Sequence, residues 1–363
     1  MYRPYSLAKL LTVSNIPKPK KQIPKTLLFF FYALNVLFGY DFGFLKTFPR
    51  KLQPLAKLIS LSITLLCVFI LGMPFKEFVG DVYVYTTNFC QYISYITVLT
   101  FTKYTLYDFM RDIYDLDEDM PRIDKERIGI VTWSYFLVVY ISKYCLYIMF
   151  CSMFDAHACD AGFIPYYIFF IPSMGIDTVS IIFILIYYYI YCSVKYLNDV
   201  LKEGANIQLL KKRYMAIADC YENIKPLYNK LIVFELLCDV PEIMAMMWHV
   251  LRNIQEERGW FTCVGEYVFA FHTMSHIIYS AIAVQMVGSQ VDAMVVKLNN
   301  ILVNEHDMKQ HDEISRLLQL MSARHLQHDV LGVVPTDMRL PVVVVELCVT
   351  YLIVIVQFTH LYD

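Results

Sequence analysis

The sequence is poor in charged residues, glycine and proline. Only 18% of its 363 residues are Asp, Glu, Lys or Arg, whereas soluble domains carry about 25%. Hydrophobic residues make up 58%, and the mean hydropathy is +0.47. The 12 glycines and 14 prolines form no flexible linker, and no run of basic residues indicates nucleic-acid binding. The composition therefore argues against linker-joined soluble domains and against a nucleic-acid partner.

Motifs for catalysis and cofactor binding are also absent. The sequence has no Gly-x-Gly-x-x-Gly, no Gly-x-x-x-x-Gly-Lys-Ser/Thr, no His-Glu-x-x-His and no Gly-x-Ser-x-Gly. Its ten cysteines include no Cys-x-x-Cys pair. The first 25 residues lack the features of a cleavable signal peptide. We therefore predict a protein that is not an enzyme, needs no cofactor and enters the membrane through an uncleaved segment.

The hydrophobic residues are gathered into long blocks. A helix needs about 20 apolar residues to cross the hydrocarbon core of a bilayer. Seven blocks meet this requirement, and they predict an all-α, seven-transmembrane helix membrane protein. The predicted spans are 55–73, 83–107, 131–150, 163–192, 229–250, 264–287 and 341–360.

An eighth apolar run, 27–44, precedes these spans. It is shorter, contains polar residues and glycines, and has basic residues on both sides. A span here would leave one of the two basic clusters outside the cell, which the positive-inside rule disfavours. We therefore favour an interfacial or re-entrant segment over a true span.

The loop charges orient the chain. With the N-terminus in the cytosol, the inner segments 1–54, 108–130, 193–228 and 288–340 carry 24 Lys and Arg. The outer segments 74–82, 151–163 and 251–263 then carry 3. The positive-inside rule predicts a cytosolic N-terminus and an extracellular C-terminus, the reverse of a G-protein-coupled receptor. Apolar stripes in 193–228 and 288–340 further predict that spans four to six continue as helices into the cytosol and pack there.

The last span carries a pattern of its own. It reads Thr350-Tyr351, five hydrophobic residues, then Gln357-Phe358. This pattern resembles, without a departure, the C-terminal signature of insect gustatory receptors. It lies in the seventh span of a chain whose length and orientation are similar to the family's. The resemblance covers the whole chain by topology and the last span by motif.

The resemblance implies a ligand-gated, non-selective cation channel built as a homo- or heterotetramer with other gustatory receptor subunits. Residues 1–54 would be a cytosolic N-terminus, and 55–340 a six-helix ligand-binding domain. Its extensions 193–228 and 288–340 would form a cytosolic anchor, and 341–363 the pore-lining seventh helix. By this likeness Thr350, Tyr351, Gln357 and Phe358 belong to the pore, with Phe358 as an apolar gate.

Glu346 lies on the cytosolic side of the same span. Four such carboxylates could form a ring that attracts cations at the inner mouth of the pore. A snorkelling or salt-bridged carboxylate accounts for the residue equally well, and both readings stay open.

Several other ionisable groups fall within predicted spans, where charge is costly and functional roles are common. Asp177 and Lys143 could pair with each other or bind a ligand, and a structural pair is favoured. Glu235, Asp239 and Glu242 are spaced i, i+4, i+7, so they share one helix face that should meet protein or water.

His272 and His276 are spaced i, i+4 in the sixth span, a spacing that suits zinc. No third ligand is apparent from the sequence, so we predict no metal and favour hydrogen bonding within a pocket. In the outer loop, Cys151 and Cys159 both face the oxidising side, and a disulfide and two free thiols are both compatible with the sequence.

The outer ends of the spans are rich in aromatic residues, of which the chain has 29 Tyr and 25 Phe. Aromatic walls with a few polar groups suit small organic ligands, although such residues also form ordinary interface belts. The candidate ligand-pocket residues are Tyr83, Tyr147, Tyr166, Asp177, Trp248, Phe271 and His272.

The predicted function is thus that of a taste receptor, which binds a small-molecule tastant. We expect it in the plasma membrane, in contact with membrane lipids, and the resemblance implies the dendrite of a sensory neuron. The compact size favours a bitter or orphan receptor by the same resemblance. The alternatives are an insect odorant receptor and a seven-helix receptor of the G-protein-coupled type. A secondary transporter would predict internal repeats, and none is visible.

The orientation gives a direct prediction. An epitope tag placed at residue 1 should stain only permeabilised cells, because the basic N-terminal segment is retained in the cytosol. A tag after Asp363 should stain intact cells and serves as the control. Staining of the N-terminal tag on intact cells would overturn the predicted topology.

Overall fold

A computed structural model describes residues 23–72, 82–116, 163–202, 206–255, 260–326, 329–330 and 334–360, with isolated positions between 130 and 141. The regular secondary structure of the described part is helical except for one two-stranded antiparallel ladder, β1 (Asp329–Val330) with β2 (Val334–Pro335). The predicted all-α fold is therefore confirmed, because so short a ladder serves only as a connection.

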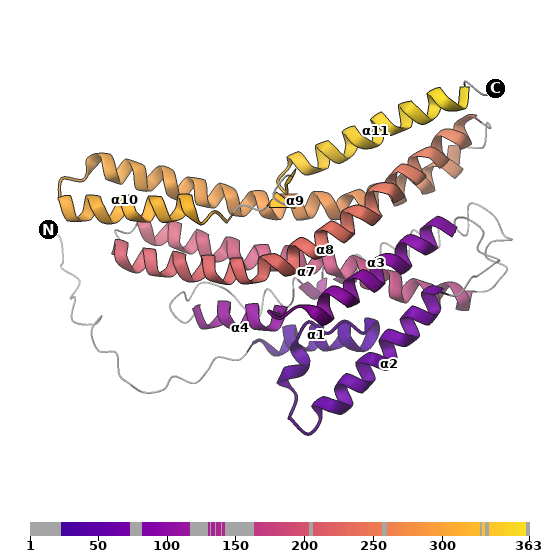
Figure 1. Cartoon of the computed structure of the whole chain (residues 1–363), viewed down its shortest axis with the longest axis horizontal. Coiled ribbons are helices and arrows are strands. Elements are labelled where there is room, and N and C mark those ends of the chain that lie inside the picture. The colour runs from indigo at the N-terminus through magenta and orange to yellow at the C-terminus, as the bar shows by residue number, and fades with distance from the viewer. Residues whose placement is uncertain are drawn as a thin grey trace.

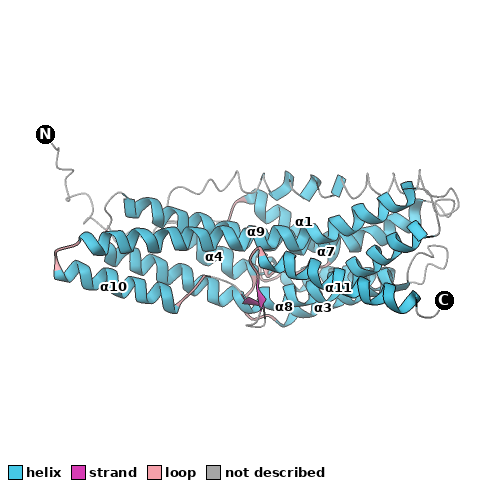
Figure 2. Cartoon of the chain, turned by 90° about the horizontal axis from the view of Figure 1, so that it is seen from above, coloured by secondary structure: helices cyan, strands magenta, loops and turns pink. Residues whose placement is uncertain are grey.

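Three long helices form the centre of the molecule. They are α7 (Phe163–Lys202), α8 (Ile207–Gln255) and α9 (Trp260–Asn304), and both views show them side by side along the long axis (Figures 1 and 2). Their 40, 49 and 45 residues correspond to about 60–74 Å, at least twice the thickness of a hydrocarbon core. Each helix therefore continues well beyond a single membrane span.

The remaining helices divide between the two ends of this bundle. At the end predicted to be cytosolic, α4 (Leu106–Leu116) packs on α8, and α10 (Met308–Ala323) packs on α8 and α9. At the other end lie α2 (Gln53–Gly72), α3 (Val82–Phe101) and the C-terminal part of α11 (Arg339–His360) (Figure 1). Four described stretches are long and apolar enough to cross a membrane: Gln53–Ile70, Met174–Leu201, Ala270–Asn304 and Arg339–Phe358.

The second span is shorter than predicted. The sequence suggested a helix over 83–107, but α3 ends at Phe101 and α4 begins at Leu106. The break has a local cause at Thr105 and Asp108. The backbone N–H of Thr105 donates to the Asp108 carboxylate at 3.1 Å, and the backbone N–H of Asp108 donates to Thr105 Oγ1 at 3.4 Å. This reciprocal capping starts a new helix.

The N-terminal apolar run packs one face against the protein and leaves Phe29 and Val36 exposed. Helix α1 (Lys25–Phe38) buries Leu27, Phe30 and Leu34 completely. Its 14 residues span about 21 Å, which is less than the hydrocarbon thickness. After Gly39 the chain returns alongside the helix, so that the Phe44 ring stacks on Phe31 with centroids 4.1 Å apart. The chain therefore turns back on itself within 27–44.

The return limb, which includes the short helix η2 (Phe44–Thr47), is tied to the start of α4. Lys46 Nζ lies 2.8 Å from Asp108 Oδ2. Burial alone would raise the pKa of Asp108, but the hydrogen bonds from Lys46 and Thr105 outweigh burial and hold this pKa below its ordinary value. The ion pair therefore places Lys46 on the same side as the capped N-terminus of α4.

Tyrosine fills much of the core, a role that the composition did not reveal. The rings of Tyr187 and Tyr228 meet edge to face with centroids 5.0 Å apart, and the Tyr114 and Tyr189 hydroxyls lie 2.6 Å apart. Such rings supply large apolar area while their hydroxyls stay hydrogen-bonded. Near the end of α10, Arg324 reaches across to α8, where its Nε donates to Glu222 Oε1 at 2.7 Å and lowers the pKa of that carboxyl.

Gly39 offers a test of this packing. Its φ is 72°, and an added Cβ would lie 2.3 Å from Thr64 Oγ1 and 2.9 Å from the Thr64 backbone nitrogen. Gly39→Ala should therefore destabilise the fold by at least about 1 kcal/mol, since the left-handed conformation alone costs that much. The thermal midpoint of the purified protein should fall, whereas Lys57→Ala on exposed α2 should leave it unchanged. An unaltered midpoint for Gly39→Ala would contradict the described turn.

Candidate functional site

A cluster of polar side chains lies at one level of the central bundle. Asp177 is 14 residues from the start of α7, Asp239 is 16 residues from the end of α8, and His276 is 16 residues from the start of α9. At 1.5 Å per residue, all three lie about 21–24 Å below the same end of the bundle. Residues distant in the sequence therefore meet near the middle of the predicted membrane layer.

Asp177 faces both histidines of α9. Its carboxylate oxygens lie 3.7 Å from His272 Nε2 and 3.9 Å from His276 Nε2. The two imidazole rings meet edge to face with centroids 4.8 Å apart. The i, i+4 spacing puts both rings on one face of α9, and Asp177 supplies the third group that the sequence could not reveal.

Helix α8 closes the cluster with carboxylates. Glu235 and Asp239 are only 2% and 3% exposed, and Glu242 is also buried, so the face predicted from their spacing does lie against protein. Ser180 Oγ donates to Glu235 Oε1 at 2.9 Å, and Gln91 Nε2 donates to Asp239 Oδ1 at 3.1 Å. Helices α3, α7, α8 and α9 thus all contribute to one site.

The cluster carries more acceptors than donors. Glu235 Oε2 and Asp239 Oδ2 have no hydrogen-bond partner among the described residues, and His272 Nε2 has none either. Within the part of the chain that the structure describes, neither Glu235 nor Asp239 forms an ion pair with a lysine or arginine. Buried carboxylates are unfavourable unless they are compensated, so this site favours an occupant that is cationic or donates hydrogen bonds.

The structure brings only some of the predicted pocket residues together. Asp177 and His272 are in contact. Trp248 is half-buried nine residues beyond Asp239 on α8, about two and a half turns further out. The Phe271 side chain is 70% exposed, although it is the neighbour of His272. The side chains of Tyr83 and Tyr166, and the whole of Tyr147, lie outside the described residues, as do Lys143, Cys151 and Cys159.

Five members of the cluster were not in the predicted pocket, and they fall into two groups. His276 carried a signal, its spacing from His272, and Glu235 and Asp239 were visible as an acidic face. Gln91 and Ser180 carried none, because a single amide or hydroxyl in a span is common and its partner depends on how the helices pack.

Helix α11 presents a second candidate site. Leu340, Val344, Cys348 and Leu352 are buried and recur every four residues, so the helix touches its own subunit along one narrow stripe. Glu346, Thr350 and Gln357 are exposed. At 100° per residue these three polar side chains fall within about 40° of one another, on the face opposite the buried stripe. Tyr351 and Phe358, 51% and 58% exposed, lie together on one side of the helix, about 110° round from that face.

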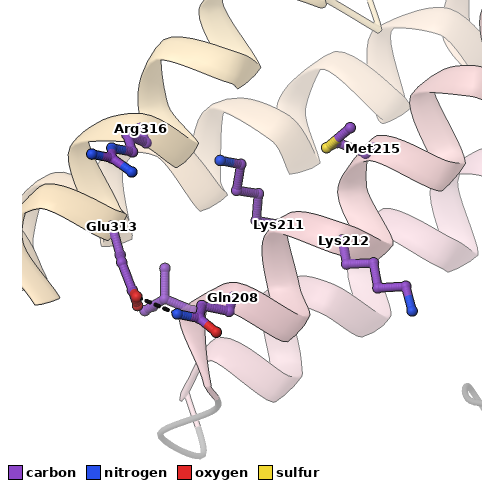
Figure 3. Close-up of a pocket in the computed structure, with 7 residues that line it drawn as sticks. Gln208, Lys211, Lys212, Met215, Glu313 and Arg316 are labelled. Atoms are coloured by element: carbon purple, nitrogen blue, oxygen red, sulfur yellow. Dashed lines mark hydrogen bonds between the residues drawn. The ribbon is translucent and has the colours of Figure 1, made fainter.

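A pocket of about 350 Å³ lies elsewhere, between the start of α8 and α10 (Figure 3). Lys211, Lys212 and Arg316 line it with Glu313, which accepts a hydrogen bond from Gln208. Lys211 is 28 residues before Asp239 along α8, about 42 Å at the helical rise. This basic pocket is therefore separate from the acidic cluster and lies at the end predicted to be cytosolic.

Comparison with known proteins identifies the family of the chain. The sequence model of the 7tm chemosensory receptor family matches residues 58–361, which include α7, α8, α9 and the terminal signature on α11. No curated protein matches the chain. The family match confirms the predicted resemblance to the chemoreceptor superfamily. The family consists of membrane receptors for small molecules and is not an enzyme family, as predicted. The chain therefore belongs to the 7tm chemosensory receptor family.

Proposed function

We propose that this chemosensory receptor is a gustatory receptor that acts as a ligand-gated, non-selective cation channel. A small organic tastant of the bitter or orphan class opens it at the plasma membrane of a sensory dendrite. Its pore is formed by α11 from four subunits, either identical or shared with other gustatory receptors. The six-helix domain 55–340 binds the ligand, and 193–228 with 288–340 anchor the subunits in the cytosol.

The exposed polar stripe of α11 carries this proposal. Glu346, Thr350 and Gln357 point away from the subunit on a helix that is otherwise nearly apolar. Polar groups on a face turned towards lipid would be unfavourable, whereas on a face turned towards a central pore they contact water. Four copies around an axis satisfy this requirement, and the Gln357-Phe358 pair then lies at the outer end of the pore.

The ligand side of the proposal rests on the inward-facing cluster. Asp177 and His272 lie beneath the outer ends of α7, α8 and α9, where Trp248 is half-buried. An aromatic ring above a few polar groups suits a small organic molecule. The terminal signature favours a gustatory over an odorant receptor, and the loop charges disfavour the G-protein-coupled orientation.

The test is whole-cell recording from non-insect cells that express this chain with G-protein signalling blocked, screened with sugars and plant alkaloids. A rapid ligand-evoked cation current is expected. Glu346→Gln should lower the single-channel cation conductance without changing ligand potency, because it removes a ring of charge from the inner mouth. Asp292→Asn, an exposed carboxylate on α9, is the control. A shift in potency with normal conductance would place Glu346 outside the pore.

Phe358→Ala tests the gate. Removing four apolar rings from a narrow point should allow water to enter and raise the resting conductance in the absence of ligand. Phe69→Ala on α2, where the phenylalanine is similarly exposed at 61%, should not raise it. An unchanged leak in a variant that reaches the cell surface would contradict the gate assignment.

A further inference from the structure

The buried cluster has the composition of a transition-metal site. His272 and His276 of α9 offer imidazole nitrogens, and Asp177 of α7 offers a carboxylate. One ligand atom from each of these three residues lies within 4.8 Å of the other two. Imidazole and carboxylate together suit zinc-class ions, whereas calcium and magnesium prefer sites made of oxygen alone.

The separations between the ligand atoms are somewhat longer than those of an occupied metal site. In a tetrahedral zinc site with metal–ligand bonds of about 2.0–2.1 Å, neighbouring ligand atoms are about 3.3 Å apart. The His272 Nε2 to Asp177 and His276 Nε2 to Asp177 separations are 3.7 and 3.9 Å. These two distances end on different oxygens of Asp177, and one ligand atom from each of the three residues lies within 4.8 Å of the others, so side-chain rotations are needed to bring the three into one coordination sphere.

The α8 carboxylates extend the same site. Glu235, Asp239 and His276 form a second triad whose ligand atoms also lie within 4.8 Å of one another, so His276 is common to both triads. Glu235 and Asp239 are more than nine-tenths buried, and each has one oxygen without a hydrogen-bond partner among the described residues. These oxygens offer the fourth ligand and neutralise the charge of a divalent ion.

We propose that the cluster binds one zinc-class divalent ion per subunit, held by Asp177, His272 and His276 with a further oxygen from Glu235 or Asp239. The ion joins α7, α8 and α9 at the middle of the membrane layer. The histidine side chains are 15% and 12% exposed, so the site is closed but not sealed from the surroundings. This inference concerns metal binding and does not depend on channel activity.

The experiment uses the full-length chain, purified in detergent, stripped of metal with a chelator and examined without tastant. Zn²⁺ should raise the thermal unfolding midpoint by a few degrees, because a ligand that binds only the folded state stabilises it. Ca²⁺ at the same concentration should not, since two of the ligands are imidazoles. An equal response to both ions would show a merely acidic site and overturn the proposal.

His276→Asn is the decisive variant, because it removes the residue that both triads share. It should weaken Zn²⁺ binding, measured by calorimetry, by at least about tenfold, since even loss of an outer-shell partner costs that much. The double variant His306→Asn with His311→Asn, at the end predicted to be cytosolic, controls for adventitious histidine binding and should retain full affinity. Unchanged affinity in His276→Asn would overturn the proposal.

A second variant and a spectroscopic readout cover the case in which His276→Asn fails to fold. His272 Nε2 makes no hydrogen bond within the described residues, so His272→Asn should fold and lose affinity by a similar factor. Co²⁺ bound to the unaltered protein should give the intense visible absorption of a four-coordinate site, and His272→Asn should lose that absorption. A weak, octahedral-type spectrum that the variant retains would contradict the site.

Discussion

The absence of water in the hydrocarbon layer is the constraint on which this structure depends. Any polar group at that depth must find its partner within the protein. The backbone meets the requirement by forming helices, and the side chains meet it by turning inward. Asp177 comes from α7 and Glu235 and Asp239 come from α8, yet all three face the same interior site, where Ser180, Gln91 and two histidines surround them. The polar side chains of the central helices are thus collected at one site within an otherwise apolar core.

The polar cluster lies next to the surface of α8 and α9 on which α11 packs. Ile243 directly follows Glu242, and Ile277 directly follows His276. Both isoleucines join Val344 and Cys348 in one apolar cluster, which is where α11 rests on the bundle. A change in the spacing of α8 and α9 at the polar cluster therefore changes the surface that supports α11. This gives ligand binding a short physical route to the proposed pore helix.

The end predicted to be cytosolic is built differently. There the core is filled by tyrosine rings such as Tyr187, Tyr221 and Tyr228, which pack edge to face between α7 and α8. Arg324 ties the end of α10 to Asp219 of α8 with a 2.7 Å ion pair. Exposed pairs of this kind add little stability, so the close aromatic packing holds this end of the bundle together. By contrast, α11 packs on the bundle along one stripe and leaves the rest of its surface exposed.

The sequence by itself determined the properties that depend on neighbouring residues along one chain. Apolar blocks predicted the helices, loop charges predicted the orientation, and a nine-residue pattern indicated the receptor family. The acidic face of α8 and the paired histidines of α9 followed from helical periodicity. Tertiary structure alone decided that Asp177 faces those histidines, that Gln91 reaches Asp239, and that 27–44 folds back into the core. These contacts depend on how helices are rotated and aligned against one another, and that alignment is set by side-chain packing across the whole bundle, which no local pattern specifies.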